Sequence, residues 1–423
     1  MRLAIAVLGA GIASGLLGVL VGQFSRLVEI VAFGFEFSTS PDGVAGARWW
    51  RRLLVALVVG AVCGLVWTRL RPRPRGYLPS VRQVGARGVR GRRRLPVVVT
   101  LLDGLAQLLV VGSGLSLGRE AAPRRFAALL GQGFADRLGL DDDTRRVMIA
   151  SAGGAGLASV YNVPLAGAAY ALEFVIRPDL RTRRGWTTLG IAVAVSAISG
   201  ATAWLFNHNA PMYRISPVQL DGQMILWAGL MGYAGLAVGL PLRSALRWAR
   251  SCTALTARLW WTVPAVTLAV AAIALWQPRI AGNGQVMVQL ALSGGPAPAM
   301  LATLCVVKAL ATVLGFRMGA TGGLLTPSVA VGATLGATLA GLSGASAPVV
   351  GVAAVVGAAC VLAETEHHPV FAATFVIGLV QASPPLTAAI ILGVTIAWTT
   401  RLLTPSGRAL IGRSKDSPDA NSG

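Results

Sequence analysis

The sequence predicts an all-α, polytopic membrane protein, and three observations support this fold class. The chain of 423 residues is 54% hydrophobic and only 13% charged, whereas an average soluble domain has about 25% charged residues. Its 52 glycines and 22 prolines lie within long apolar runs, where membrane helices tolerate both residues. Its basic residues gather between those runs. These features exclude an ordinary soluble enzyme.

The apolar runs give the order of the predicted membrane helices. A bilayer core about 30 Å thick needs about 20 apolar residues per straight helix. Runs of this kind cover residues 3–34, 53–70, 95–117, 147–176, 186–206, 223–249, 260–276, 298–316, 324–342, 347–364 and 370–402. Several runs are too long, or too often interrupted by glycine, for one straight span. We expect ten or more helices, some broken or re-entrant, in one membrane domain over residues 1–411, followed by a polar tail at 412–423.

The first run, after Arg2, has an alternative interpretation as a signal peptide. Residues 3–21 are apolar throughout, which is longer than the core of about 7–15 residues in a signal peptide. We therefore interpret the run as the first membrane helix.

The formal net charge of +21 comes mainly from arginine-rich segments between the apolar runs. These segments cover residues 69–94, 177–184, 243–258 and 401–415. In a membrane protein such segments mark cytoplasmic loops, so we expect both termini in the cytoplasm. Nucleic-acid binding is the alternative for the first segment, and we do not predict it. The four cysteines are widely separated, which favours neither disulfides nor a zinc site.

The two halves of the chain share a pattern of glycine-rich breaks followed by proline. We expect the proline that ends each break to start a helix, Pro123 in the first half and Pro327 in the second. A second proline-started helix follows at Pro164, 41 positions later, and at Pro369, 42 positions later. Paired breaks at corresponding positions indicate a transporter site between two repeats. The repeats would cover about 1–205 and 223–405. The alternative is two unrelated Gly/Pro loops.

The chemistry of such breaks suits an anion. A helix that begins at membrane depth presents free N–H groups and about half a positive charge. Two facing starts would bind an anion without a buried cationic side chain. Glu120 lies inside the first break, and a carboxylate there would compete with a permeant anion until protonated. The alternative is a permanent helix cap, paired with Arg119 or Arg124.

These motifs together resemble the CLC family of voltage-gated chloride channels and proton/chloride exchangers, in its bacterial type without cytoplasmic regulatory domains. The matching segments are 118–120, 155–167 with Glu173, and 319–327, and the resemblance extends from about residue 70 to 400. It implies an inverted-repeat CLC-like fold and a homodimer in which each subunit has its own anion pathway. It also implies that Glu120 is the gating glutamate. The implied anion-binding residues are Gly118, Arg119, Glu120, Ala121, Gly323, Leu324, Leu325 and Thr326.

The sequence also departs from the family pattern. Ala121-Ala122 precedes Pro123 where the family has a single glycine, and Leu325 replaces the usual phenylalanine. The best-placed match to the early anion-facing serine is Gly76, within residues 76–80, and no tyrosine follows Tyr233. The preferred anion therefore stays open.

One departure bears on mechanism. Exchangers of the family carry an inner, proton-relaying glutamate directly after the position of Glu173, and this chain has Phe174 there. We therefore expect passive, channel-like conduction, with a proton-coupled anion/H+ antiporter as the alternative. Glu173 is a possible proton relay, although a structural carboxylate bonded to nearby helix termini is the favoured interpretation.

No feature predicts a metal, a cofactor or an enzyme. His367 and His368, with Glu364 and Glu366, could hold a metal, but adjacent residues on a helix point apart, and we interpret them as a polar loop. The sequence thus predicts a multi-pass protein of the bacterial inner membrane. Its predicted partners are chloride or another small anion, the lipid bilayer and a second copy of the chain.

Overall fold

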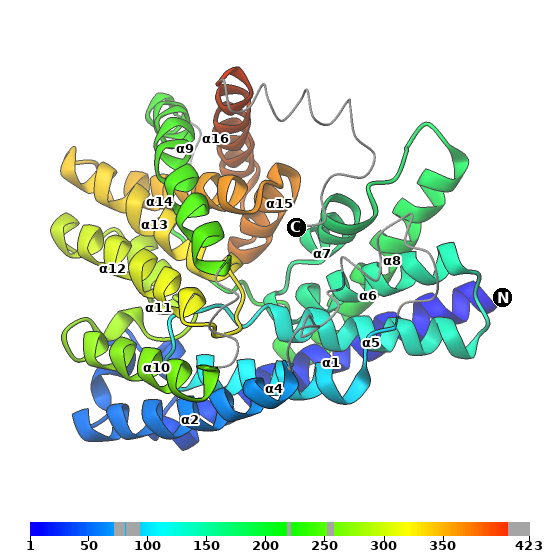
Figure 1. The fold of residues 1–423 in the computed structure, drawn as a ribbon. Helices are drawn as coiled ribbons and strands as arrows, with labels where there is room; N and C mark the ends of the chain where they lie inside the picture. The colour runs from blue at the N-terminus through cyan, green and yellow to red at the C-terminus, as the bar shows by residue number, and fades with distance from the viewer. Residues whose placement is uncertain (72–80, 82–93, 218–220, 252–257, 405–423) are drawn as a thin grey trace.

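The computed structural model of the chain is built from helices (Figure 1). It describes residues 1–71, 81, 94–217, 221–251 and 258–404. Within these ranges no β-sheet occurs, and extended backbone pairs in one isolated bridge between Gly118 and Gly323. The predicted all-α fold is therefore confirmed. The polar tail at 412–423 and the Gly76 segment lie outside the described residues.

The first half of the chain runs from a long N-terminal helix to the connector that precedes residue 222. Its helices are α1 (Arg2–Phe33), α2 (Trp49–Leu70), α4 (Val97–Gly112), α5 (Ala121–Arg137), α6 (Asp142–Tyr161), α7 (Pro164–Ala169) and α8 (Arg183–Asn207). Three short elements connect them: the 3-10 helices η1 (Phe37–Thr39) and η2 (Gly43–Gly46), and the π-helix η3 (Tyr170–Ile176).

The second half contains the remaining helices. They are α9 (Gly222–Arg250), α10 (Leu259–Trp276), the 3-10 helix η5 (Pro278–Ile280), α11 (Gln285–Leu292), α12 (Pro298–Arg317), α13 (Leu325–Leu342), α14 (Ala347–Glu366), α15 (Pro369–Val380) and α16 (Pro384–Leu403). Among the residues that the structure describes, nine helices are long and apolar enough to cross a membrane.

The long apolar runs are broken at residues that cannot continue a helix. The run at 147–176 stops at Asn162, which takes the left-handed conformation with φ of 56°, and restarts at Pro164. The run at 370–402 stops at Gln381, with φ of 46°, and restarts at Pro384. Proline suits the first turn of a helix, because the N–H group that it lacks would have no partner within the helix there. The prediction of broken helices is confirmed.

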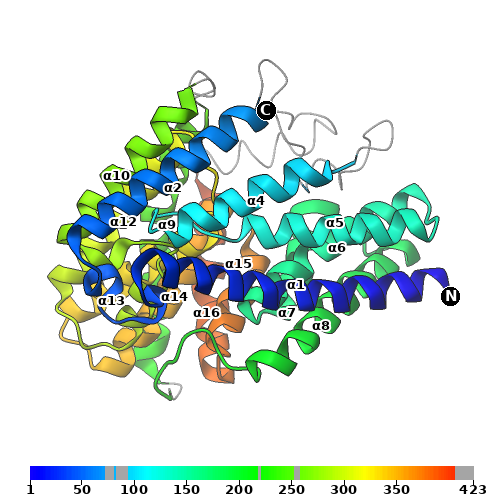
Figure 2. The same ribbon diagram turned by 90° about the horizontal axis from the view of Figure 1, so that it is seen from below.

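The halves repeat one order of elements. In the first, α5 and α6 precede the proline-started α7; in the second, α13 and α14 precede the proline-started α15. Figures 1 and 2 show α5, α6 and α8 on one side of the molecule and α12, α13 and α14 on the other. In Figure 2, α1 runs along α5, α6 and α8, against which it packs.

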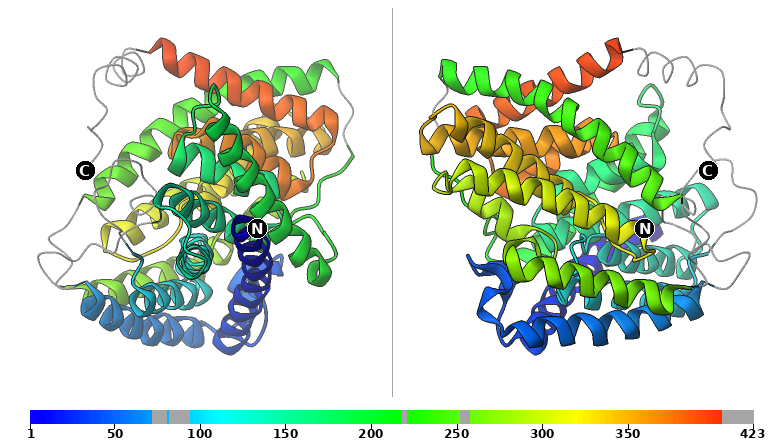
Figure 3. Two further views of the ribbon diagram at one scale, coloured as in Figure 1. Left: turned by 90° about the vertical axis from the view of Figure 1, so that its right-hand side faces the viewer. Right: turned by 60° about the vertical axis from the view of Figure 1, so that its left-hand side comes forward.

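One helix of the first half crosses to the second. Helix α2 packs on α10, and the right view of Figure 3 shows it along the edge of the second half. Gly60 and Gly64 of α2 face Pro264 and Thr267 of α10 without side chains between the backbones. Small residues at such crossings permit the close packing that holds membrane helices together.

Helices α13 and α14 form the most buried pair of spans. The buried share of their central windows is 78% and 83%, against 28% for α2. Gly332 of α13 faces the carbonyl of Gly357 and the Cα of Ala358, and a Cβ there would overlap both. This packing fixes the direction of α13, and with it the position of its N-terminus.

We predict that Gly332→Ala lowers stability, whereas Gly190→Ala on the open face of α8, where nothing lies within 4 Å of an added Cβ, does not. Overpacking a tight interface costs roughly 1–3 kcal/mol. The thermal unfolding midpoint of the detergent-purified protein measures the difference. Equal midpoints for the two variants would contradict the close approach of α13 and α14.

Candidate anion-binding site

The structure brings the two sequence breaks into direct contact. Gly118 N–H donates to the Gly323 carbonyl at 2.9 Å, and Gly323 N–H donates to the Gly118 carbonyl at 2.6 Å. Helix α5 begins at Ala121 and α13 begins at Leu325, so each starts within three residues of this bridge. Two segments that lie about 200 positions apart in the sequence therefore form one site.

The prolines of the two breaks sit later in their helices than the sequence predicted. Pro123 and Pro327 each occupy the third helical position rather than the first, because α5 begins at Ala121 and α13 at Leu325. The first four N–H groups of a helix have no intrahelical partner, so proline is accommodated there. The shift leaves the N–H groups of the first two residues of each helix free for other acceptors.

The Glu120 side chain reaches across the bridge to the start of α13. Its Oε1 accepts hydrogen bonds from the Thr326 N–H at 2.5 Å and from the Thr326 hydroxyl at 2.6 Å. The side chain is fully buried. It therefore caps α13, a helix of the opposite half, and not its own helix α5. On the α5 side of the break, Arg124 Nε donates to the Glu120 carbonyl at 3.0 Å.

Glycine on both sides of the bridge makes this position possible. A Cβ on either Gly118 or Gly323 would overlap the Glu120 carboxylate. The free N–H groups and partial positive charge of a helix start stabilise an anion. In this structure the negative group at the α13 start is the Glu120 carboxylate.

Side chains from a helix of each half hold the first break in place. Gln107 of α4 donates from Nε2 to the Gly118 carbonyl at 3.0 Å. Thr312 of α12 donates from its hydroxyl to the Ser116 carbonyl at 3.0 Å. These bonds satisfy carbonyl groups that a broken helix leaves open inside the protein.

Lys308 supplies a buried positive charge close to this site. It is fully buried, and its Nζ donates to the carbonyls of Ile280 at 3.1 Å and Gly282 at 2.6 Å. Its charge interacts electrostatically with Glu120, which favours an anion at the α13 start. The sequence analysis missed this residue, although a lone lysine inside the apolar run at 298–316 marks a functional position in a membrane protein.

A buried carboxylate anchors the segment that leads into α13. Asp103 of α4 is fully buried and forms ion pairs with Arg125 of α5 and, at 3.7 Å, with Arg71. Arg71 in turn donates to the Gly319 carbonyl at 3.2 Å and to the Thr321 hydroxyl. A buried charge that is paired on several sides is strongly positioned, so this network fixes the second break relative to α4 and α5.

The remaining predicted anion-site residues also lie in the two breaks or in the first turns that follow. Ala121 is the first residue of α5, and Leu324 and Leu325 are the cap and first residue of α13. Arg119 is half-buried, and its charge interacts with Glu29 and with two tyrosines that the sequence analysis did not select.

Glu173 caps a helix of the second half. From η3, its Oε2 accepts the Phe371 N–H at 2.7 Å, and its Oε1 accepts the Val370 N–H at 3.4 Å. Both donors belong to the first turn of α15. The next residue, Phe174, stacks on the His368 ring with centroids 3.6 Å apart. This geometry favours the structural interpretation of Glu173.

The acidic and histidine side chains near the end of α14 point to different partners. Glu364 pairs with Arg401 at 2.7 Å, and the His367 ring lies against Trp398 with centroids 4.8 Å apart. His368 Nδ1 lies 2.5 Å from the Glu366 carbonyl oxygen. These groups therefore do not converge on one point.

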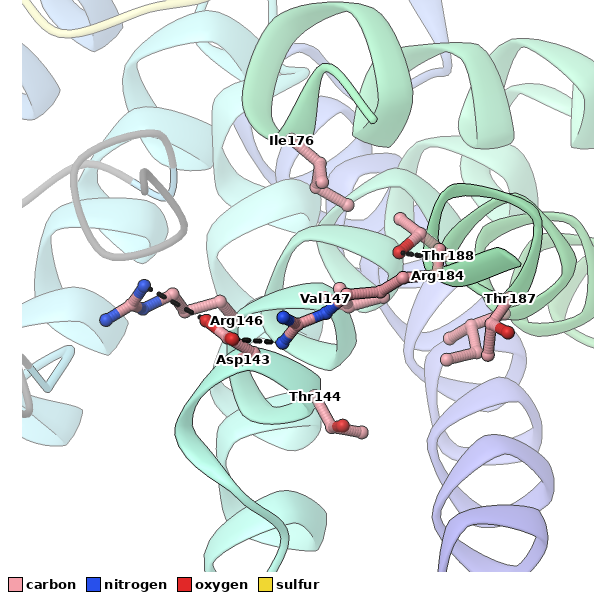
Figure 4. A pocket seen from close by; sticks show the side chains of 9 residues that line it. Asp143, Thr144, Arg146, Val147, Ile176, Arg184, Thr187 and Thr188 are labelled. Atoms are coloured by element: carbon pink, nitrogen blue, oxygen red, sulfur yellow. Dashed lines mark hydrogen bonds and ion pairs between the residues drawn. The ribbon is translucent and has the colours of Figure 1, made fainter. Parts of the chain in front are cut away.

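A separate small pocket lies where α6 and α8 begin (Figure 4). Asp143 pairs there with Arg146 at 3.3 Å and with Arg184, as the dashed lines in Figure 4 show. The pocket measures about 60 Å³. It lies at the far end of α5 from Glu120, about 25 Å away for 17 residues of helix. Its ion pairs join α6 to α8 and do not contribute to the anion site.

Comparison with known proteins identifies the family. A family model described as "Voltage gated chloride channel" matches residues 59–401. The chain belongs to this CLC family. It is therefore a multi-pass membrane protein for anion transport and not an enzyme. A curated relative, the "Voltage-gated ClC-type chloride channel ClcB" of Salmonella typhimurium, is 28% identical over 342 residues, which cover 78% of each chain. The protein of the same name from Shigella flexneri is 29% identical over 295 residues, 67% of each chain.

Solved structures share the CLC fold of this chain. The X-ray structure of "a slow cyanobacterial Cl-/H+ antiporter" has a TM-score of 0.76 at 18% identity, over 99% of both chains. A "CLC-type fluoride/proton antiporter" has a TM-score of 0.71 at 19% identity, over 93% of this chain and 94% of that one. Together with the family match, these likenesses confirm the CLC-like fold predicted from the two breaks.

We predict that Thr326→Val speeds chloride efflux from proteoliposomes at neutral pH by about tenfold or more. The substitution keeps the Thr326 N–H but removes the hydroxyl bond to Glu120, and a hydrogen bond to a charged group contributes about 1.5–3 kcal/mol. The matched control is Thr334→Val on the same helix, whose hydroxyl bonds to the Ala330 carbonyl at 2.8 Å. An efflux rate for Thr326→Val equal to that of the control would show that the hydroxyl does not retain the carboxylate.

We predict that Glu173→Gln lowers stability by about 1 kcal/mol, the usual size of a helix-cap effect, and leaves any proton movement unchanged. The reason is that its carboxylate accepts two N–H groups at the start of α15. Thermal unfolding and pH recording during chloride efflux measure the two effects. Unchanged stability together with lost proton movement would instead identify Glu173 as a relay.

Proposed function

We propose that this CLC chain conducts chloride or another small anion passively, past the start of α13, with Glu120 as the gate. The observation that carries the proposal is the position of the Glu120 carboxylate on the Thr326 N–H and hydroxyl. A negative side chain that occupies the binding position of an anion blocks it, and the same position becomes available when the side chain leaves.

Protonation supplies the trigger for gate opening. A neutral carboxyl group loses most of its attraction to the partial positive charge of a helix start, so a proton on Glu120 releases it from α13. The anion then takes its place on the N–H groups of Leu325 and Thr326. Lys308 supports the site, because its buried side chain lies nearby and interacts electrostatically with Glu120.

We favour passive conduction over proton-coupled exchange because of two neighbouring residues, Glu173 and Phe174. Phe174 stands where the family resemblance implies a proton-relaying acid, and its ring stacks on His368. Glu173 is engaged at the start of α15. The printed name of the Salmonella typhimurium relative, a chloride channel, agrees with this choice.

A proton-coupled antiporter is the second candidate. Two structural neighbours are described by their titles as Cl-/H+ and fluoride/proton antiporters. Glu120 could itself carry the proton in such a mechanism, since it is the buried acid that alternates with the anion.

The proposal also includes the membrane in which the protein lies, its orientation there and its oligomeric state. It lies in the bacterial inner membrane with both termini in the cytoplasm, because the arginine-rich segment before α8 and its counterparts follow the positive-inside rule. The two repeats span about 1–205 and 223–405, and the protein works as a homodimer in which each subunit has its own pathway.

We predict that wild-type proteoliposomes release chloride without stoichiometric proton movement and that acidic pH accelerates the release. Glu120→Gln should conduct at a rate independent of pH, because its side chain no longer titrates. Glu36→Gln is the matched control, since Glu36 forms a surface ion pair with Arg26 at 2.9 Å. It should retain the wild-type pH dependence.

Two results would contradict this function. Uphill proton movement coupled to chloride in the wild type, and lost in Glu120→Gln, would establish the antiporter instead. No flux of chloride or of any other small anion would overturn anion transport by this chain.

A further inference from the structure

Two buried tyrosine hydroxyls near the gate lack a hydrogen-bond acceptor. Tyr161 is the last residue of α6, and Tyr213 lies in the connector between α8 and α9. Each side chain is 1% exposed, and neither hydroxyl forms a hydrogen bond of normal geometry within the described part of the chain. A buried hydroxyl without a partner is costly, so each is a donor in need of an acceptor.

Both hydroxyls share one neighbourhood with the gate. Tyr161 and Tyr213 each interact electrostatically with Glu120 and with Arg119, and the Arg119 guanidinium lies beside Tyr161. The Nε of Arg119 also lacks an acceptor among the residues described. Besides the second carboxylate oxygen of Glu120, the unsatisfied groups at this place are N–H and O–H donors beside one positive charge.

The backbone holds Tyr213 firmly in this position. The N–H groups of Met212 and Tyr213 donate to the Leu379 carbonyl at 2.9 and 3.1 Å. The next residue, Arg214, exchanges two 3.0 Å hydrogen bonds with the Gln289 side chain. The connector is thus fastened to α15 and α11 on either side of Tyr213.

The Tyr161 ring is held by packing. It lies edge-on to Phe375 of α15, with ring centroids 5.7 Å apart. Its hydroxyl can therefore be removed by substitution with phenylalanine without disturbing the ring contact.

A large cavity borders Tyr213. It measures about 650 Å³ and is lined by residues 38–41, the connector residues 211–214, and residues of α11 and its end. Tyr213 belongs to this lining and also interacts with Glu120. It therefore stands between the cavity, which is wide enough for a hydrated ion, and the gate.

We propose that the hydroxyls of Tyr161 and Tyr213, together with Arg119, form an anion subsite between this cavity and Glu120. The subsite takes a small inorganic anion such as a halide before the anion reaches the start of α13. The inference rests on the proposed function, since it adds a second anion-binding position to the same pathway. Arg119 supplies the charge, which Glu29 partly balances, so the anion is attracted without being trapped.

The test uses three tyrosine variants and reconstituted full-length protein. Tyr161→Phe and Tyr213→Phe each remove one hydroxyl, and Tyr233→Phe on α9, 58% exposed, is the matched control. Chloride flux is measured while the chloride concentration is varied on each side of the membrane. We expect each of the first two variants to raise the half-saturating concentration about tenfold on one side only, as for the loss of a donor to an anion, and the control to match the wild type.

A binding measurement separates failure of the subsite from failure of transport. Bromide titration of the detergent-purified protein by calorimetry should show weaker binding in both phenylalanine variants, whether or not the wild type conducts. If wild-type flux is absent but this weakening is seen, the proposed function fails and the subsite stands. If both variants match the wild type in flux and in bromide binding, the hydroxyls are merely hydrated and the subsite is wrong. If one of the two variants aggregates on gel filtration, the flux and bromide binding of the other variant provide the test.

Discussion

The site depends on the contact between the Glu120 carboxylate and the N-terminus of α13. The contact joins a side chain of the first half to backbone and hydroxyl donors of the second, at Thr326. It requires a helix that begins inside the protein, because only a helix start offers free N–H groups. It also requires glycine at 118 and 323, since a Cβ at either position would overlap the carboxylate. The rest of the fold supplies these two conditions.

A helix start at membrane depth is stable only if its surroundings satisfy the broken backbone. In this chain the Gly118–Gly323 bridge joins the segments that precede the two helices, and Gln107 and Thr312 bond to the segment before α5. Close packing of α13 on α14 fixes the axis along which the helix points. Lys308 adds a buried charge whose bonds to two carbonyls anchor it near the site. The same groups therefore stabilise the break and, in the function that we propose, make it attractive to an anion.

The sequence predicts the parts of the site that depend on local backbone preferences. Glycine and proline mark where helices break, and Glu120 is conspicuous as an acid within such a break. The sequence does not reveal which distant segments meet there. Tyr213 lies in a connector with no motif of its own. The connector is held near Glu120 by the bond from the Tyr213 N–H to the Leu379 carbonyl and by the bond from the Arg214 N–H to the Gln289 side chain. Pro123 marked the break correctly but not the first helical residue, because several positions in the first turn accept proline.

In the function that we propose, the Glu120 carboxylate and the transported anion occupy the same position at the start of α13. Bromide is a heavy substitute for chloride, and its anomalous scattering locates it in crystals of wild type at alkaline pH and of Glu120→Ala. The account predicts bromide on the Thr326 N–H in Glu120→Ala, and no bromide there in the wild type, where the carboxylate holds the site. Two results would contradict a shared position. One is bromide on the Thr326 N–H while the Glu120 carboxylate is also bound there, and the other is the absence of bromide from the α13 start in both the wild type and Glu120→Ala.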